Sequence, residues 1–328
     1  MYGSDQAGMV CAYAFVRGGP GRAVDFHEAA ALLLAPPGER AEFLWLHFSL
    51  ANAASGRWLR EHTQLPDTFF ETQDSASTRL EVTDDALTGV LNDVQFFAVE
   101  ASAASTMTLH VTPGLLVTAR TTALRAIDRL RASVRAGEVF ASPADLLAHL
   151  LRDQADVLVA IVRDATSQVD AIEDHILSHR RGSRQQLGVI RRVLVRLQRL
   201  LAPEPAALFR LLNKPPAWLT ESDLAELRNS AEELTAAVTD SVALGERVRL
   251  LQEELTVILS ERTNETLFIL TVVTVLALPL TIIPGLFGMN VGGVPFADRP
   301  GGFWIVVFLV AAIVGLGAAL VVRLRDRR

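Results

Sequence analysis

The sequence predicts a membrane protein in which an N-terminal α+β domain is followed by a long helix and two transmembrane helices. Three observations lead to this fold class. The chain of 328 residues is 50% hydrophobic, and its apolar residues are concentrated near one end. The stretches Leu267–Phe287 and Phe303–Val322 contain no charged residue, and each is long enough to cross a hydrocarbon core of about 30 Å as a helix. Between Ser222 and Leu278 there is no proline, which permits one long helix leading into the first span.

Residues 1–141 alternate between strand-like and helix-like stretches. The run Glu42–Phe48 follows a proline-glycine turn and predicts a buried strand. Met107–Val111 and Leu115–Arg120 flank the turn at Pro113–Gly114 and predict two further strands. Thr122–Ala136 predicts a helix that ends at a glycine. We therefore expect a mixed α/β domain, without a predicted strand order.

Residues 142–221 have apolar residues at helical spacing and predict a helical hairpin region. Ser142 is a candidate N-cap and Pro143 a first-turn proline. A glycine near residue 182 predicts a break. The second helix is expected to reach about Leu200, where Pro203 and Pro205 should stop it.

Residues 222–290 predict a stalk helix that continues into the first span. Thr220 and Asp223 have the spacing of a capping box at its start. Residues 291–302 form the predicted outer loop, residues 303–322 the second span and residues 323–328 a basic tail. By the positive-inside rule the four arginines of this tail are cytoplasmic, so both termini are expected there. The single cysteine, Cys11, fits a reducing compartment.

Opposite charges are grouped in two segments of the helical region. Seven arginines lie between Arg180 and Arg199, and seven acids lie between Glu221 and Glu246. These segments are either two solvated helix faces or a basic helix that folds back along the acidic first half of the long helix. Neither an aromatic platform nor a known binding module accompanies the arginines, so nucleic acid is not an expected partner.

The first span carries a polar stripe. Its polar members follow one another at steps of seven, three and seven residues, with apolar or small residues between them on the same helix face. One interpretation is that each threonine bonds its own backbone and faces lipid. The other is that several copies of the chain direct the stripe into a shared polar space, with the second span outside. The stripe consists of Asn264, Thr271, Thr274, Leu278, Thr281 and Gly285.

The first span ends in the stretch "PGLFGMNVGGVP", residues 284–295. Read simply, this stretch is a helix end and a loop. Alternatively, Gly288 carbonyls and Asn290 side chains from several copies form a ring that holds a hydrated cation. The sequence has no nucleophile constellation and no phosphate-binding glycine loop, so an enzyme is not expected.

The "GMN" tripeptide between two spans, with a basic tail, resembles the CorA family of divalent-metal transporters. The longer "GMNVGGVP", preceded by "ERTNETLFILTVVTVLALPLT", is more similar to the ZntB-like zinc transporter subfamily. The resemblance implies a funnel-shaped homopentamer with the stripe lining a pore, and an outer selectivity site at Gly288, Met289 and Asn290. Members of the magnesium branch usually carry a glutamate soon after the tripeptide, whereas the only acid in this loop is Asp298.

We therefore expect a divalent-cation transporter of the bacterial inner membrane, with zinc as its cargo and no catalytic cofactor. Its expected partners are other copies of the chain, the lipid bilayer and the cation. One alternative keeps the architecture with magnesium, cobalt or nickel as cargo. Another is a membrane-anchored cytoplasmic scaffold. His175 and His179 are four apart on a predicted helix and are either a cytoplasmic metal site or solvated surface residues.

Overall fold

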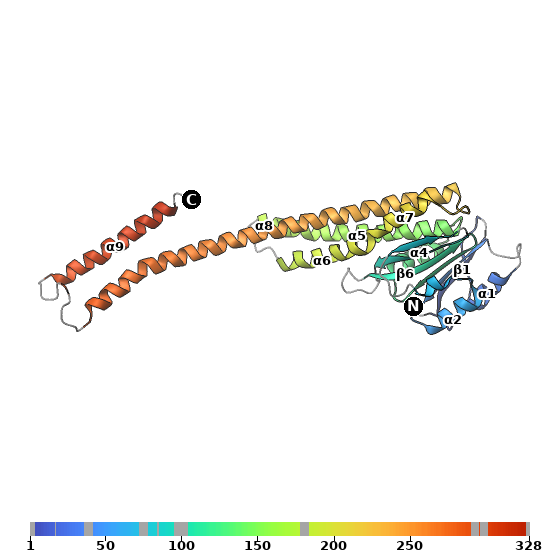
Figure 1. Ribbon diagram of the computed structural model, residues 1–328, viewed down its shortest axis with the longest axis horizontal. Coiled ribbons are helices and arrows are strands. Elements are labelled where there is room, and N and C mark those ends of the chain that lie inside the picture. Colours follow the sequence, from blue (N-terminus) through green and yellow to red (C-terminus); the bar gives the residue numbers. More distant parts are fainter. Residues whose placement is uncertain are drawn as a thin grey trace. The chain divides into compact units, whose positions relative to one another are not determined.

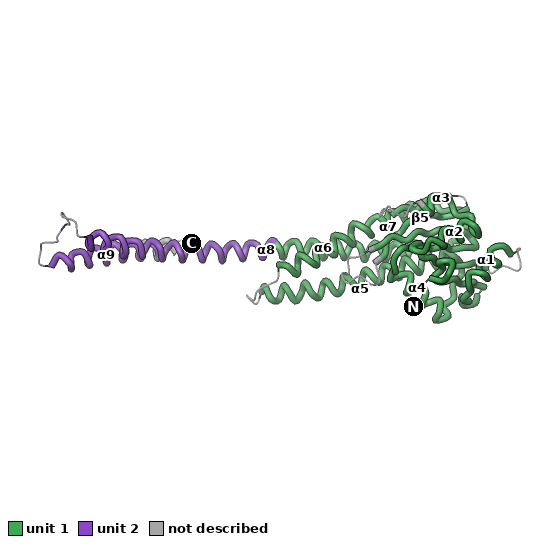
Figure 2. The backbone as a smooth tube through the Cα atoms, turned by 90° about the horizontal axis from the view of Figure 1, so that it is seen from below, with its two compact units in different colours: residues 1–252 green, residues 253–328 purple. Residues whose placement is uncertain are grey.

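A computed structural model describes residues 4–16, 18–35, 42–71, 78–83, 85–94, 104–177, 184–289, 295 and 301–325. The chain divides into two compact units, residues 1–252 and residues 253–328 (Figure 2), and each is described by itself. The predicted α+β domain and the helical region both belong to the first unit.

The first unit contains a seven-stranded sheet (Figure 1), in which β3 pairs with β7 in parallel and the other pairs of neighbouring strands are antiparallel. The strands predicted near residues 42–48, 107–111 and 115–120 are confirmed as β3, β6 and β7. In the order β2-β1-β3-β7-β6-β5-β4, the strands are Arg22–Ala23, Met9–Phe15, Phe43–Ser49, Leu115–Arg120, Ala104–Thr112, Leu87–Val94 and Arg79–Val82.

Side chains alternate between the two faces of the sheet along each strand, and helices cover both faces. On one face, Leu46 packs in a cluster with α1 (Phe26–Leu34), α2 (Ala53–His62) and α3 (Asp67–Glu71). On the other face, Trp45 packs in a cluster with α4 (Arg125–Arg135) and the start of α5. The helix predicted over residues 122–136 is thus confirmed as α4. The two-sided burial explains why β3 is an almost continuous apolar run.

The helical region begins with α5 (Pro143–Leu177), and the predicted cap is confirmed because the Asp145 amide donates to Ser142 Oγ at 3.0 Å. The next helix, α6 (Arg184–Leu201), ends close to the predicted position. The two prolines after it also have a second role. Pro203 and Pro205 lie in the first turn of a further helix, α7 (Pro203–Asn213), where a missing amide proton costs no helix bond.

The long helix is α8 (Glu221–Phe287), as predicted. Its capping box is confirmed: the Asp223 amide donates to Thr220 Oγ1 at 3.1 Å, and the Thr220 amide donates to Asp223 Oδ2 at 3.0 Å. Within the first unit α5 runs along it. Arg152 of α5 pairs with Glu226 at 2.6 Å, and Arg247 of α8 pairs with Asp170 of α5 at 2.7 Å.

The basic helix α6 does fold back along α8, and two hydrogen bonds join the described parts of these helices. Gln198 Nε2 donates to the Ser241 carbonyl at 2.7 Å, and Arg191 donates to the Gln252 side chain at 3.2 Å. The ion pair to Glu226 comes instead from Arg152 of α5. The reason is that α6 turns its leucines toward its neighbours and leaves Arg191, like most of its arginines, exposed.

The second unit holds the remainder of α8 and α9 (Gly302–Arg325), which lie side by side (Figure 1). Leu276 of α8 lies 3.4 Å from the position that a Cβ on Gly317 of α9 would occupy. Both helices are long and apolar enough to cross a membrane. The two predicted spans therefore correspond to helices, and a glycine in α9 permits their close approach.

Candidate cation path

The polar stripe of α8 faces away from α9. All six stripe residues are exposed in the isolated chain. At about 100° per residue, the centre of the stripe lies about 140° around the helix from the centre of the half-buried face. The second helix of the unit therefore leaves the stripe uncovered. The half-buried face between residues 266 and 289 consists of Phe268, Val272, Leu276, Pro279, Ile283 and Phe287.

Each threonine of the stripe bonds its own helix, as the simpler interpretation predicted. Thr271 Oγ1 donates to the Leu267 carbonyl at 2.8 Å, and Thr274 Oγ1 donates to the Leu270 carbonyl at 2.9 Å. Thr281 Oγ1 donates to the carbonyls of residues 277 and 278. Donation uses the only proton of each hydroxyl and leaves the oxygen lone pairs available as acceptors. The stripe can therefore accept hydrogen bonds from water while its own donors stay satisfied.

The chemistry of the stripe suits a hydrated cation. The span from Leu267 to Phe287 has no ionisable side chain, so a bare divalent ion would find no carboxylate or imidazole to replace its water. Asn264 adds an exposed amide at one end of the stripe. Water molecules around a divalent cation are strong donors, and hydroxyl and amide oxygens are suitable acceptors for them.

The structure describes two of the three predicted outer-site residues, Gly288 and Met289, at the end of α8. The Gly288 amide donates to the Pro284 carbonyl at 2.8 Å, and Met289 is exposed. A Cβ added at Gly288 would lie 3.2 Å from the same carbonyl, which is close enough to favour glycine. Asn290 lies outside the described residues. The proposed ring of Gly288 and Asn290 groups therefore stays a prediction.

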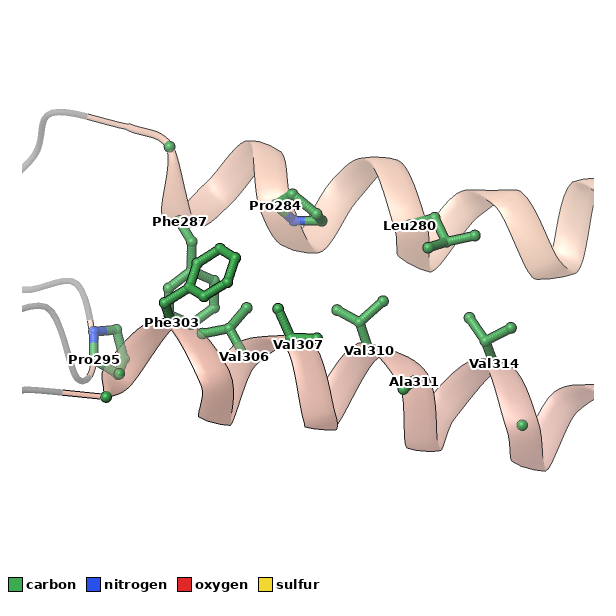
Figure 3. Close-up of a pocket in the computed structure, with 14 residues that line it drawn as sticks. Leu280, Pro284, Phe287, Pro295, Phe303, Val306, Val307, Val310, Ala311 and Val314 are labelled. Atoms are coloured by element: carbon green, nitrogen blue, oxygen red, sulfur yellow. The ribbon is translucent and has the colours of Figure 1, made fainter.

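A cavity in the second unit lies between α8 and α9, and the described part of its lining does not suit a cation. Figure 3 shows Pro284 and Leu280 of α8 facing a row of valines on α9. The cavity has a volume of about 1050 Å³ and is lined mainly by aliphatic and aromatic side chains. Among the residues that the structure describes, none that lines this cavity is charged. It borders the half-buried side of α8, so the stripe and the cavity lie on different sides of the helix.

The predicted histidine pair is only partly described. His175 is exposed near the end of α5, and His179 lies outside the described residues. The neighbouring Glu173 is engaged by Arg247 of α8. Among the residues that the structure describes, no group of three His, Cys, Asp or Glu side chains is arranged to hold a metal. The pair therefore stays a prediction.

Two other histidines are buried in the sheet. His47 Nε2 accepts from Arg120 Nε at 2.8 Å, and its Nδ1 lies 2.8 Å from Thr118 Oγ1. Burial, followed by the charge of Arg120, lowers the pKa of His47 well below its usual value. Burial also lowers the pKa of His110 to about 4. Both rings are therefore neutral structural groups at neutral pH.

Glu204, at the start of α7, is fully buried and was not predicted from the sequence. Its carboxyl oxygens accept hydrogen bonds from the Asn92 amide and the Gln154 side chain, both at 2.5 Å. The only sequence signal was an acid in a proline-rich segment. Such a pattern normally marks an exposed first turn of a helix, so burial could not be inferred from it.

Comparison with known proteins gives four consistent matches. The family described as CorA-like Mg²⁺ transporter protein matches residues 40–324. The divalent cation transporter CmaX of Pseudomonas aeruginosa is 28% identical and aligns over 94% of each chain. The zinc transport protein ZntB of Pectobacterium carotovorum is 26% identical over 83% of this chain and 84% of its own. The solved structure of full-length CmaX matches with a TM-score of 0.82 and 26% identity, covering 98% of this chain and 99% of that one.

Proposed function

This chain belongs to the CorA-like Mg²⁺ transporter family and is a divalent-cation transporter, and we propose that it carries zinc through a pore lined by α8. In this proposal five copies of the chain form a homopentamer and direct their stripes toward a common axis. Two spans from one chain cannot enclose a polar space, so the pore has to be shared. The observation that carries the proposal is the orientation of the stripe, which α9 leaves uncovered.

The cation crosses the span with its hydration shell. Asn264, Thr271, Thr274 and Thr281 supply acceptors for shell water, while Leu278 is an apolar position between them and Gly285 continues the stripe beyond Thr281. Gly288, Met289 and Asn290 form the outer selectivity site. The residues before the first span and the basic tail face the cytoplasm, and the loop between the spans is outside. The membrane is the bacterial inner membrane.

Zinc is favoured over magnesium by two observations. ZntB is among the matched relatives, and the outer loop lacks a glutamate close to the tripeptide, with Asp298 as its only acid. CmaX carries the broader name of divalent cation transporter, so magnesium, cobalt and nickel remain the competing cargo. A scaffold without transport is opposed by the uncovered polar stripe, because a mere anchor has no use for it in hydrocarbon.

The first experiment is ion flux into proteoliposomes that contain the purified full-length protein. We expect zinc entry to exceed magnesium entry at equal concentrations, and Asn290→Ala to abolish or change the flux while light scattering still finds the same oligomer. Faster magnesium flux would reverse the choice of cargo. If the protein were a monomer and carried no divalent cation, the membrane-anchored scaffold would be the remaining interpretation.

The cytoplasmic histidine pair has a separate test. We propose that His175 and His179 bind zinc and sense its cytoplasmic level. In this proposal they take no part in conducting the ion. The double substitution of both residues by alanine should lower zinc bound per chain, measured by calorimetry on the full-length protein in detergent, while the stripe is intact. Unchanged binding would assign the pair to the solvated surface.

A further inference from the structure

A cavity of mixed polarity lies at one end of the sheet, beside the apolar cluster of α1, α2 and α3. Its volume is about 590 Å³, and sites for small molecules commonly measure about 300–1,000 Å³. Five separate parts of the first unit contribute to its walls. They are the end of α1, the start of β3, the link between α2 and α3, the turn between β4 and β5, and the hairpin of β6 and β7.

One part of the lining is apolar. Leu33, Leu65 and Leu115 line the cavity and also pack on the apolar cluster between the sheet and α1, α2 and α3. Leu44 of β3 is buried and lines the cavity too. The apolar body of a ligand would leave water when it met these leucines, which favours binding.

Two histidines of the lining each use one ring nitrogen within the described part of the chain and leave the other without a partner. His62 Nδ1, at the end of α2, lies 3.0 Å from the Trp58 carbonyl oxygen. A carbonyl can only accept, so Nδ1 carries the proton and Nε2 of the neutral ring is an acceptor. His110 of β6 is 6% exposed, and its Nδ1 lies 2.7 Å from Thr88 Oγ1. The second nitrogen of this buried ring is therefore left for a ligand.

Two carboxylates belong to the same lining. Glu42 precedes β3, Asp85 lies in the turn between β4 and β5, and both are exposed. Among the described residues, neither carboxylate has an ion-pair partner, and the lining contains no lysine or arginine. Burial lowers the pKa of His110 to about 4, so this ring adds no positive charge at neutral pH. The acids therefore give the described lining a negative charge, which attracts a cation.

The combination of leucines and carboxylates fits an organic cation better than a bare metal ion. Among the residues that the structure describes, no three His, Cys, Asp or Glu side chains are arranged to hold a metal. An ammonium group donates three hydrogen bonds and needs only acceptors, which the carboxylates and the His62 ring supply. The leucines offer nothing to an ion and its water, but they suit an aliphatic or aromatic body.

We propose that this cavity binds an amphipathic organic amine, with its ammonium group paired with Glu42 and Asp85 and its apolar body against Leu44 and Leu115. The site belongs to the first unit alone. It does not depend on which ion is transported, or on whether transport occurs.

The test is calorimetry on the full-length protein in detergent at neutral pH, with 2-phenylethylamine as the probe and detergent alone as the blank. Two matched compounds separate charge from shape: 2-phenylethanol has the same ring without a charge, and 3-phenylpropanoate has the opposite charge. We expect the amine to bind roughly tenfold more tightly than either, because only the amine makes charge-assisted hydrogen bonds to the carboxylates. Equal affinity of the alcohol or of the carboxylate would overturn the proposal, as would the absence of saturable amine binding.

Substitutions then place the bound probe in the cavity. Glu42→Gln and Asp85→Asn each remove one charge from an exposed side chain, so the fold should survive. Each should weaken amine binding roughly threefold, and the double substitution roughly tenfold. Glu232→Gln changes an exposed glutamate of α8 outside the cavity and should bind as wild type does.

A further variant tests the location without changing a charge. Ala86 lines the cavity, and Ala86→Phe adds a bulky ring there, so binding of the amine should be lost. Unchanged affinity in Ala86→Phe or in the double acid variant would overturn the proposal. An equal loss in Glu232→Gln would do the same, because it would assign the effect to the overall charge of the protein.

Discussion

The substitution Thr274→Val gives a direct test of the cation path, because it changes one atom type on the stripe and little else. Valine keeps the β-branched shape of threonine. The lost hydroxyl donates to the Leu270 carbonyl at 2.9 Å, but in a regular helix that carbonyl also accepts a backbone N–H bond. The fold and the assembly should therefore survive, while each chain presents one acceptor fewer to the proposed pore.

The expected loss of zinc flux is large because every chain around the proposed pore axis loses one hydroxyl group. A hydroxyl that accepts a hydrogen bond from shell water contributes about 0.5–1.5 kcal/mol net. One substitution per chain removes five such groups from the proposed pentamer, so the barrier rises by about 2.5 kcal/mol at the lower limit. At about 1.4 kcal/mol for each factor of ten in rate, zinc flux should fall roughly 60-fold.

The assay is the initial rate of zinc entry into proteoliposomes loaded with a zinc indicator. Thr266→Val is the matched control, since Thr266 makes the same kind of back-bond, to the Arg262 carbonyl at 2.9 Å. By the helical wheel it lies about 110° from the centre of the stripe, so its flux should stay within about twofold of wild type. Equal losses at both positions, or nearly full flux in Thr274→Val, would refute the reasoning.

Three further predictions concern the first unit and use thermal unfolding of the purified protein in detergent. Because burial lowers the pKa of His47 below its ordinary value of 6.5, stability should be lost as the pH falls, by about 1.4 kcal/mol per pH unit below 6.5; a His47→Gln variant with the same acid slope would contradict this. Gly89→Ala places a Cβ at 2.3 Å from the Arg79 carbonyl oxygen and should lower the free energy of unfolding by about 1–3 kcal/mol. Gly56→Ala, where the nearest atom is 3.5 Å away inside α2, should raise the free energy of unfolding by about 0.5–1 kcal/mol. If both substitutions changed the stability in the same direction, this prediction would be wrong. Arg247→Gln breaks partly exposed ion pairs between α8 and α5 and should cost at most about 1 kcal/mol, less at high salt; a loss unaffected by salt would point to packing instead.

Local signals in the sequence were enough to predict the elements that depend on local physics. The capping box at Thr220 and Asp223, the N-cap at Ser142 and the uninterrupted apolar spacing of α8 each act within a few residues. The strand order could not be predicted, because the parallel pairing of β3 with β7 joins Leu44 to Leu115. That pairing depends on long-range burial, which no short motif specifies.

The candidate site could also be predicted only in part from the sequence. The phase of the stripe was readable from its spacing, and the orientation of the stripe away from α9 adds what spacing alone could not give. The partner of the acidic stretch of α8 was not readable from charge. Apolar contacts set the rotation of α6, so Arg152 of α5 meets Glu226 instead. Glu204 was missed because burial of an acid depends on the elements that close around it.

The two interpretations of the threonines, which the sequence left as alternatives, describe the same side chains. A hydroxyl whose proton is held by a carbonyl one turn earlier, as at Thr271 and Thr274, offers its surroundings only oxygen lone pairs. Cation-bound water donates to such a group directly. An anion or its shell needs donors, and each threonine would first have to break its bond to the helix. In the proposed pore, a ring of back-bonded hydroxyls would therefore discriminate by charge sign without any carboxylate and without removing water from the ion. On this argument, replacing Thr281 by serine should preserve cation flux, because serine can make the same back-bond.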